Sequence, residues 1–142
     1  MKIYLDTSFL VSLYSLDRNS LAAVRLIRAS GNRRVMTNLG EFEAENALQL
    51  RVFHGEISLA QAQASWDDLT SDLRAGILQL IPLPPEAFTR GLQLSRQTTA
   101  RMGTRSADIL HVAAALELGC EALYSFDQRQ RKLARAMHLK LN

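Results

Sequence analysis

The amino-acid sequence predicts an α/β domain built around a mainly parallel β-sheet. Short apolar segments that resemble buried strands alternate with longer segments of helical pattern, and the 142 residues match the length of one domain, residues 1–142. Strands are expected at residues 2–6, 35–37, 77–81, 122–124 and 138–141. In such sheets ligands bind outside the carboxyl ends of the strands, so a residue that directly follows a strand is a candidate for a functional site.

The first half of the chain contains signals for the starts and ends of helices. Thr7 and Ser8 favour a helix start directly after the first strand, and Ser58 favours another. Hydroxyl side chains suit these positions because they accept hydrogen bonds from the free N–H groups of a first helical turn. Gly31 and Gly55 are expected to end helices. The predicted helices span residues 7–15, 20–29, 39–54 and 58–75.

The second half begins with the third strand and a proline-rich run at residues 82–85. This run excludes a helix until after it, because proline lacks the N–H group that a helix interior needs. Helices are then expected over residues 86–101, 105–118 and 127–137. The segment 105–118 is apolar almost all round, which predicts a buried helix, and Gly119 is expected to end it.

The composition is that of an ordinary globular chain, with 47% hydrophobic and 22% charged residues. The single cysteine, Cys120, cannot form an internal disulfide, so we expect a small buried residue and a reducing compartment. The N-terminus lacks the features of a signal peptide, and no apolar run approaches the ~18 residues that a membrane span needs. A soluble, cytoplasmic protein with no membrane contact is therefore expected.

Two carboxylates follow predicted strands. Asp6 ends the first strand, whose apolar residues give no reason for a charge at its tip unless that charge has a function. Asp127 follows the strand at residues 122–124, after Ser125, and precedes a helix. A structural interpretation of Asp127 as a helix N-cap therefore stands beside the functional one.

A third carboxylate interrupts an apolar helix face. The helix at residues 39–54 has an apolar stripe formed by Leu39, Phe42, Leu50 and Phe53. At ~100° per residue, Glu43 falls near the middle of this stripe, whereas Glu41 and Glu45 fall on the opposite face. Of the three acids, Glu43 is the one that solubility does not explain.

The fourth unusual carboxylate, Asp108, opens the apolar helix at residues 105–118. Because the helix dipole favours negative charge in the first turn, a purely structural role is an alternative to a functional one. His111 lies one turn later, and we interpret it as a hydrogen-bonded structural histidine in preference to a metal ligand.

Four carboxylates at one sheet edge would repel one another, and divalent cations relieve that repulsion. An all-oxygen ligand set suits hard ions such as Mg²⁺ or Mn²⁺, and the absence of paired histidine or cysteine argues against zinc. With four of the 14 acids in such a site, ten remain against 17 Lys and Arg. A basic surface around an acidic metal pocket is typical of proteins that act on a polyanion with phosphodiester bonds.

The sequence resembles the PIN-domain family, especially the VapC-type toxins of prokaryotic toxin–antitoxin pairs. Four motifs carry the resemblance in order along nearly the whole chain: YLDTSFLVSLY, EAENAL, RSADILHVAAA and LYSFDQRQRKLA. The resemblance implies a three-layer α/β/α sandwich with a parallel five-stranded sheet. It also implies an endoribonuclease that depends on Mg²⁺ or Mn²⁺ and uses water as the nucleophile.

The resemblance further implies roles for individual residues. Asp6, Glu43 and Asp108 would hold the ion as catalytic ligands, and Asp127 would complete the cluster. The hydroxyls of Ser8 and Ser125 would orient carboxylates or bind water.

Phosphate binding and partners complete what the resemblance implies. Arg105, and also Arg101, would be placed to meet a phosphate of the RNA substrate, although surface charge or an ion pair is the simpler explanation of either arginine. The family analogy further implies a homodimer and a cognate antitoxin protein that covers the active-site groove.

Three alternatives remain open from the sequence. A non-catalytic nucleic-acid-binding domain would have the same basic surface, and a DNA-directed nuclease would have the same acids, because the reader of the RNA 2′-OH cannot be located from sequence. A haloacid-dehalogenase-like phosphatase also begins with an acid at a strand end. The reaction of such phosphatases requires a second aspartate two residues after the first, and this chain has Ser8 at that position.

Overall fold

The computed structural model describes residues 1–29 and 31–142 and has a five-stranded parallel sheet at its centre. The strands are β1 (Lys2–Leu5), β2 (Arg33–Thr37), β3 (Gln79–Ile81), β4 (Ala122–Tyr124) and β5 (Lys140–Leu141). They lie in the order β3-β2-β1-β4-β5, and each neighbouring pair is parallel. The chain thus builds the sheet outward from β1 in one direction and then returns to the other side of β1 with β4. Such a switch in strand order opens a crevice for ligands at the carboxyl ends of β1 and β4.

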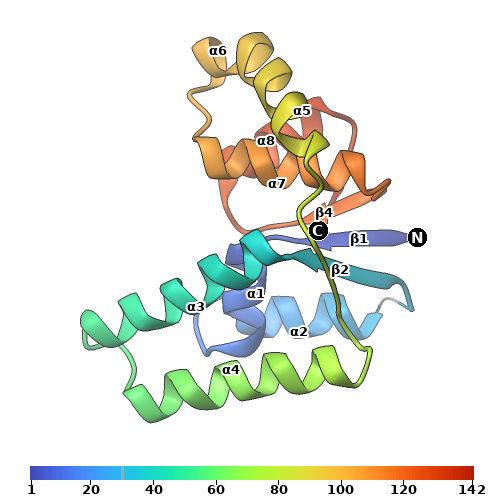
Figure 1. Cartoon of the computed structure of the whole chain (residues 1–142). Helices are drawn as coiled ribbons and strands as arrows, with labels where there is room; N and C mark the ends of the chain where they lie inside the picture. The colour runs from blue at the N-terminus through green and yellow to red at the C-terminus, as the bar shows by residue number, and fades with distance from the viewer. Residues whose placement is uncertain (30) are drawn as a thin grey trace.

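Helices cover both faces of the sheet, as Figure 1 shows, and this confirms the predicted three-layer α/β/α sandwich. The helical segments are α1 (Thr7–Tyr14), α2 (Ser20–Ala29), α3 (Asn38–Phe53), α4 (Leu59–Arg74), α5 (Glu86–Leu94), η1 (Ser95–Thr99), α6 (Ala100–Met102), α7 (Ser106–Glu117) and α8 (Gln128–Ala136). None of the helices in the described ranges is long and apolar enough to cross a membrane.

Two hydrophobic clusters lie on the two sides of the sheet, because successive strand side chains point to opposite faces. On one side, Tyr4 of β1 and Leu123 of β4 pack with residues of α5, α7 and α8. On the other side, Ile3 and Leu5 pack with residues of α1, α2 and α4. The alternation along β1 leaves the next residue, Asp6, at the end of the strand and the start of α1.

The predicted elements are present, with shifts that have local causes. The third strand begins at Gln79 instead of Ile77, because the N–H groups of Ile77 and Leu78 bond to the Asp72 carbonyl and close the end of α4. The helix expected over residues 86–101 is divided into α5, the π-helical turn η1 and α6. Within η1 the Thr98 hydroxyl donates to the carbonyl of Leu94 (2.7 Å) and competes with the regular backbone ladder.

The helix signals at Ser58 and Gly119 are confirmed, whereas α1 is capped by Asp6 and not by the hydroxyl of Thr7 or Ser8. The Ser58 hydroxyl accepts from the N–H of Gln61 (3.1 Å), and the Gln61 side chain accepts from the N–H of Ser58 (2.8 Å), so α4 begins with a capping box. After α7, Gly119 has a φ of 65°, a left-handed conformation that glycine adopts without a Cβ clash.

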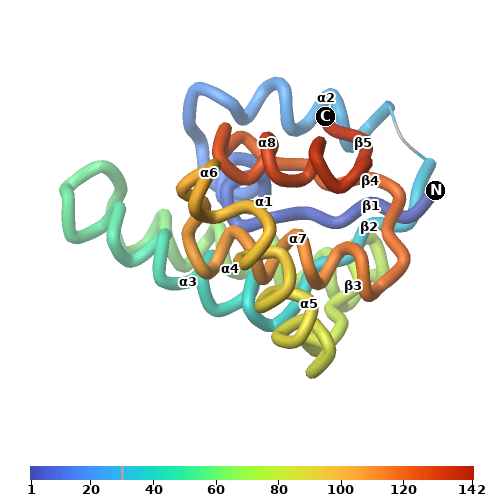
Figure 2. Tube along the Cα trace, turned by 90° about the horizontal axis from the view of Figure 1, so that it is seen from above, coloured from blue at the N-terminus to red at the C-terminus, as the bar shows by residue number. Residues whose placement is uncertain are grey.

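The apolar stripe of α3 does not face the core. Phe42, Leu50 and Phe53 are 73%, 48% and 82% exposed. The buried residues of this helix are instead Gly40, Ala44 and Leu48. Figures 1 and 2 show that α3 and α4 form a hairpin whose turn projects away from the sheet, and Leu50 and Phe53 belong to the end of α3 that leads into this turn.

Candidate active site

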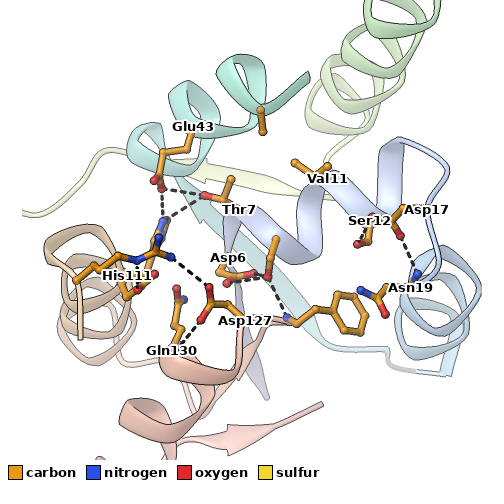
Figure 3. A pocket seen from close by; sticks show the side chains of 15 residues that line it. Asp6, Thr7, Val11, Ser12, Asp17, Asn19, Glu43, His111, Asp127 and Gln130 are labelled. Atoms are coloured by element: carbon orange, nitrogen blue, oxygen red, sulfur yellow. Dashed lines mark hydrogen bonds and ion pairs between the residues drawn. The ribbon is translucent and has the colours of Figure 1, made fainter. Parts of the chain in front are cut away.

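A cavity of about 470 Å³ lies at the carboxyl ends of β1 and β4 and brings together the four candidate carboxylates (Figure 3). Asp6 follows β1, Glu43 comes from α3, Asp108 from the first turn of α7, and Asp127 from the start of α8. The lining residues are Asp6, Thr7, Ser8, Val11, Ser12, Asp17, Asn19, Glu43, Ala47, Arg105, Asp108, His111, Phe126, Asp127 and Gln130. The switch in strand order places acids from four segments around one space.

Asp6 is the most deeply buried of these acids, at 2% exposed. Its Oδ1 accepts the N–H of Phe9 (2.8 Å), so the carboxylate caps α1. Ser8 Oγ donates to both of its oxygens (2.8 and 3.0 Å), and Ser125 Oγ donates to Oδ2 (2.5 Å). Burial raises the pKa of Asp6, while the hydrogen bonds from Ser125, Phe9 and Ser8 oppose that rise.

The two serines also join the ends of β1 and β4. Ser8 Oγ accepts the N–H of Phe126 (2.9 Å), and Ser125 Oγ accepts the N–H of Asp127 (3.0 Å). The two hydroxyls lie 3.3 Å apart. They fix the orientation of the Asp6 carboxylate and connect its position to that of Asp127.

Glu43 lines the cavity from α3. Thr7 Oγ1 donates to its Oε1 (2.8 Å), and the same oxygen is hydrogen-bonded to Nε2 of His111. Burial acts to raise the pKa of Glu43, but the hydrogen bonds from His111 and Thr7 and the charge of Arg105 hold the pKa below its usual range. Glu43 is therefore an ionised carboxylate whose second oxygen, Oε2, has no hydrogen bond within the described residues.

Asp108 and Asp127 share one cation, the guanidinium of Arg105. Arg105 Nε lies 3.4 Å from Asp108 Oδ2, and its Nη2 lies 3.4 Å from Asp127 Oδ2. Burial and the charge of Asp127 raise the pKa of Asp108, while Arg105 lowers it. Asp127 Oδ1 also accepts the N–H groups of Arg129 and Gln130 (2.9 and 3.1 Å). Asp127 is thus the N-cap of α8, as the sequence suggested, and it also lines the cavity.

The other sequence candidates divide into two groups. Ser8, Ser125 and Arg105 lie against the acids, as described above. Arg101 lies exposed on α6 and is not among the residues that line the cavity. The structure thus brings Arg105 into the candidate site and leaves Arg101 outside it.

Thr7, His111 and Gln130 are among the cavity residues that had no site role in the sequence interpretation. His111 lies three residues after Asp108, and that helical spacing places both on one side of α7. Gln130 has the same spacing from Asp127. Its side chain is 2% exposed, and its Nε2 has no hydrogen-bond partner within the described chain.

The chemistry of the donors fits a hard divalent cation. They are all oxygens, and two of the acids have raised pKa values that an added positive charge would lower. In the described part of the chain, no three His, Cys, Asp or Glu side chains are already grouped so that they could hold one metal ion. Glu43 is turned to His111, Asp127 caps α8, and Arg105 provides the positive charge among these acids.

Fold and site together define the class: a parallel α/β sandwich protein with an acidic cavity at the switch in strand order. Within this class the chain belongs to the PIN domain family, whose model matches residues 3–136. No curated protein matches the chain in sequence at a significant level.

Several solved structures share the fold. Mycobacterium tuberculosis VapC20, described as a sarcin-ricin loop cleaving toxin, has a TM-score of 0.71 and 18% identity, over 92% of this chain and 93% of that one. VapBC2 from Rickettsia felis, bound to a promoter DNA fragment, has a TM-score of 0.69 and 16% identity, over 100% and 98%. FitAcB from Neisseria gonorrhoeae has a TM-score of 0.68 and 14% identity, over 98% and 95%. At these identities the likeness is one of fold.

Proposed function

We propose that this protein is a divalent-metal-dependent endoribonuclease and the toxin of a toxin–antitoxin pair. The observation that carries the proposal is the convergence of Asp6, Glu43, Asp108 and Asp127 on one cavity in a member of the PIN domain family. The fold shared with VapC20, a sarcin-ricin loop cleaving toxin, supports RNA as the substrate class.

In this proposal Asp6, Glu43 and Asp108 hold Mg²⁺ or Mn²⁺, and Asp127 completes the set. A bound divalent ion lowers the pKa of a coordinated water and offsets negative charge on a phosphate. Asp6 suits a ligand role because its carboxylate is fixed by Ser8 and Ser125 before any ion binds. Glu43 suits the same role because only one of its oxygens is hydrogen-bonded within the described chain.

The remaining cavity residues would act on the substrate. The Arg105 side chain is 63% exposed, and its two ion pairs among the described residues are long contacts of 3.4 Å, so it can turn from the acids to a phosphate of the RNA. The unpaired Nε2 of Gln130 can donate to a phosphate oxygen or to a water in the cavity. Both groups offer hydrogen-bond donors, which phosphodiester recognition requires among four acids.

A cognate antitoxin and a second copy of the chain are the proposed protein partners. Phe42 and Phe53 are exposed on α3, the helix that carries Glu43, and an antitoxin that covers the cavity would bury them. On the other side of the sheet, Phe88 and Leu92 of α5 are 55% and 58% exposed and line an apolar cavity beside α7. That surface would serve a homodimer.

The first test is cleavage of total cellular RNA by the purified protein in EDTA and after addition of Mn²⁺ or Mg²⁺. We expect ion-dependent cleavage that Asp6→Asn abolishes, since asparagine keeps the cap of α1 but removes the charge. Glu41→Gln serves as the matched control, because Glu41 does not line the cavity. DNA oligonucleotides of the same sequence distinguish a ribonuclease from a DNA nuclease, and equal cutting of both would refute the RNA assignment.

A further inference from the structure

A continuous chain of buried polar side chains leads from the sheet to Glu43. Tyr4 of β1 and Thr37 of β2 are fully buried, and His111 of α7 is 2% exposed. Tyr4 Oη lies 3.1 Å from Thr37 Oγ1 and 2.7 Å from Nδ1 of His111. Nε2 of His111 is in turn hydrogen-bonded to Glu43 Oε1. Polar groups in such a core are costly unless they are paired, and here each one has a partner.

The chemistry of the two ends sets the direction of this chain. A carboxylate that holds a metal ion has no proton of its own, so Glu43 only accepts hydrogen bonds and the N–H of this contact must belong to Nε2 of His111. The Tyr4 phenol has a single O–H, so it can donate to only one of its two partners, Thr37 or His111. If that O–H donates to Nδ1 across the shorter 2.7 Å contact, the Thr37 hydroxyl donates to Tyr4 Oη. Every group then donates toward Glu43.

We propose that Thr37, Tyr4 and His111 form a one-way hydrogen-bond relay that fixes the Nε2–H tautomer of His111 and orients Glu43. His111 and Thr7 both donate to Oε1, which leaves Oε2 for a ligand in the cavity that Glu43 lines. His111 and Tyr4 are positioning residues, because they act through Glu43 and not on the reacting atoms. The inference rests on the proposed function in that Glu43 is taken as a ligand of the metal ion.

Paired variants distinguish a role of these residues in orienting Glu43 from a general role in packing the core. His111→Leu removes the donor to Glu43, whereas His111→Gln keeps an amide N–H near the position of Nε2. Tyr4→Phe removes only the phenol oxygen. Its matched control is Tyr14→Phe, which removes a phenol hydrogen bond of the same 2.7 Å length, to Asp72 on the other side of the sheet.

Two measurements on the full-length protein need no RNA. Calorimetric titration with Mn²⁺ should show binding about 10–100-fold weaker for His111→Leu and about 10-fold weaker for Tyr4→Phe, as for the loss of hydrogen bonds that orient a metal ligand. We expect His111→Gln to recover most of the affinity and Tyr14→Phe to match the wild type. Nitrogen-NMR spectra of isotope-labelled histidine should show an unprotonated Nδ1 at His111 in the wild type, and Tyr4→Phe should shift that signal.

The outcomes distinguish this inference from the proposed function. Wild-type Mn²⁺ affinity in both His111→Leu and Tyr4→Phe, or a proton on Nδ1 of His111 in the wild type, would overturn the relay even if the protein cuts RNA. Weakened binding in the variants of a protein that binds Mn²⁺ but cuts no RNA would support the relay and refute the nuclease. A wild-type protein that binds no Mn²⁺ would refute both. If His111→Leu does not fold, Tyr4→Phe and His111→Gln still decide the question.

Discussion

Ser125→Ala is a sharp test of how the buried Asp6 carboxylate is held. Ser125 is fully buried, its hydroxyl donates to Asp6 Oδ2 at 2.5 Å, and it accepts the N–H of Asp127 at 3.0 Å. Alanine removes both hydrogen bonds and leaves a cavity no larger than one oxygen atom. The change therefore acts on the hydrogen bonds and not on the packing.

The expected loss of stability follows from these two hydrogen bonds. A hydrogen bond to a charged group contributes about 1.5–3 kcal/mol, and the unpaired N–H of Asp127 adds about 1 kcal/mol. The free energy of unfolding should thus fall by about 2.5–4 kcal/mol at neutral pH. For a chain of this size, a fall in Tm of roughly 8–15 °C corresponds to that loss.

The loss should also depend on pH, with a sign that the pKa of Asp6 sets. Burial raises this pKa in the folded protein, and the Ser125 hydrogen bond limits the rise. In Ser125→Ala the pKa of folded Asp6 rises further, so the variant loses additional stability as the pH increases through it. Below the pKa of an unfolded aspartate, about 4, Asp6 is protonated in both states and this part of the difference vanishes.

The assay is urea or thermal unfolding in EDTA, at neutral pH and near the lowest pH at which the wild type stays folded. The control is Thr98→Val, which removes a buried hydroxyl bonded to the neutral carbonyl of Leu94. Its effect should be the same at both pH values. If the destabilisation by Ser125→Ala is equally independent of pH, the Asp6 carboxylate is not the group that Ser125 stabilises, and the reasoning is refuted.

Three further predictions concern the cavity. Asp108→Asn should lower metal-dependent cleavage more than about 100-fold yet raise stability in EDTA, since it removes a charge that burial and Asp127 disfavour; a less stable variant in thermal unfolding would contradict this. Glu43→Gln should lose cleavage in the RNA assay while Glu41→Gln matches the wild type, because only Glu43 lines the cavity; equal damage from both would mean that the site does not include Glu43. Gln130→Leu should change Tm little, because its Nε2 has no hydrogen bond to lose, but should raise the KM for RNA; an unchanged KM would exclude Gln130 from substrate binding.

The positions of the strands and helices could be predicted from the sequence because they depend on local signals. Strand residues such as Ile3 and Leu5 belong to short apolar segments. Ser58 starts a helix through the hydrogen bonds of its capping box, and Gly119 ends one through its positive φ angle. The candidate acids Asp6 and Asp127 were identified in the same way, as charges at strand ends. Their catalytic roles stay predictions until cleavage is measured.

Glu43 lines the cavity, but not for the reason that helical periodicity gave. It was singled out because it interrupts the stripe that contains Phe42 and Phe53, yet those phenylalanines are exposed. The helix turns its small residues inward, and Glu43 reaches the cavity at the boundary between its buried and exposed sides. Helical periodicity gives the angle between side chains, but it does not say which angle faces the core.

The sequence by itself determined the elements, their order and the four acids at or near their ends. Only the tertiary structure decided that β4 returns beside β1, that Glu43 meets His111 across 68 positions of the chain, and that the orphaned amide of Gln130 lies among the acids. The physical reason is the range of the forces involved. Turns, caps and periodicity act within a few residues, whereas a site between segments depends on the complementary packing of surfaces that no local pattern specifies.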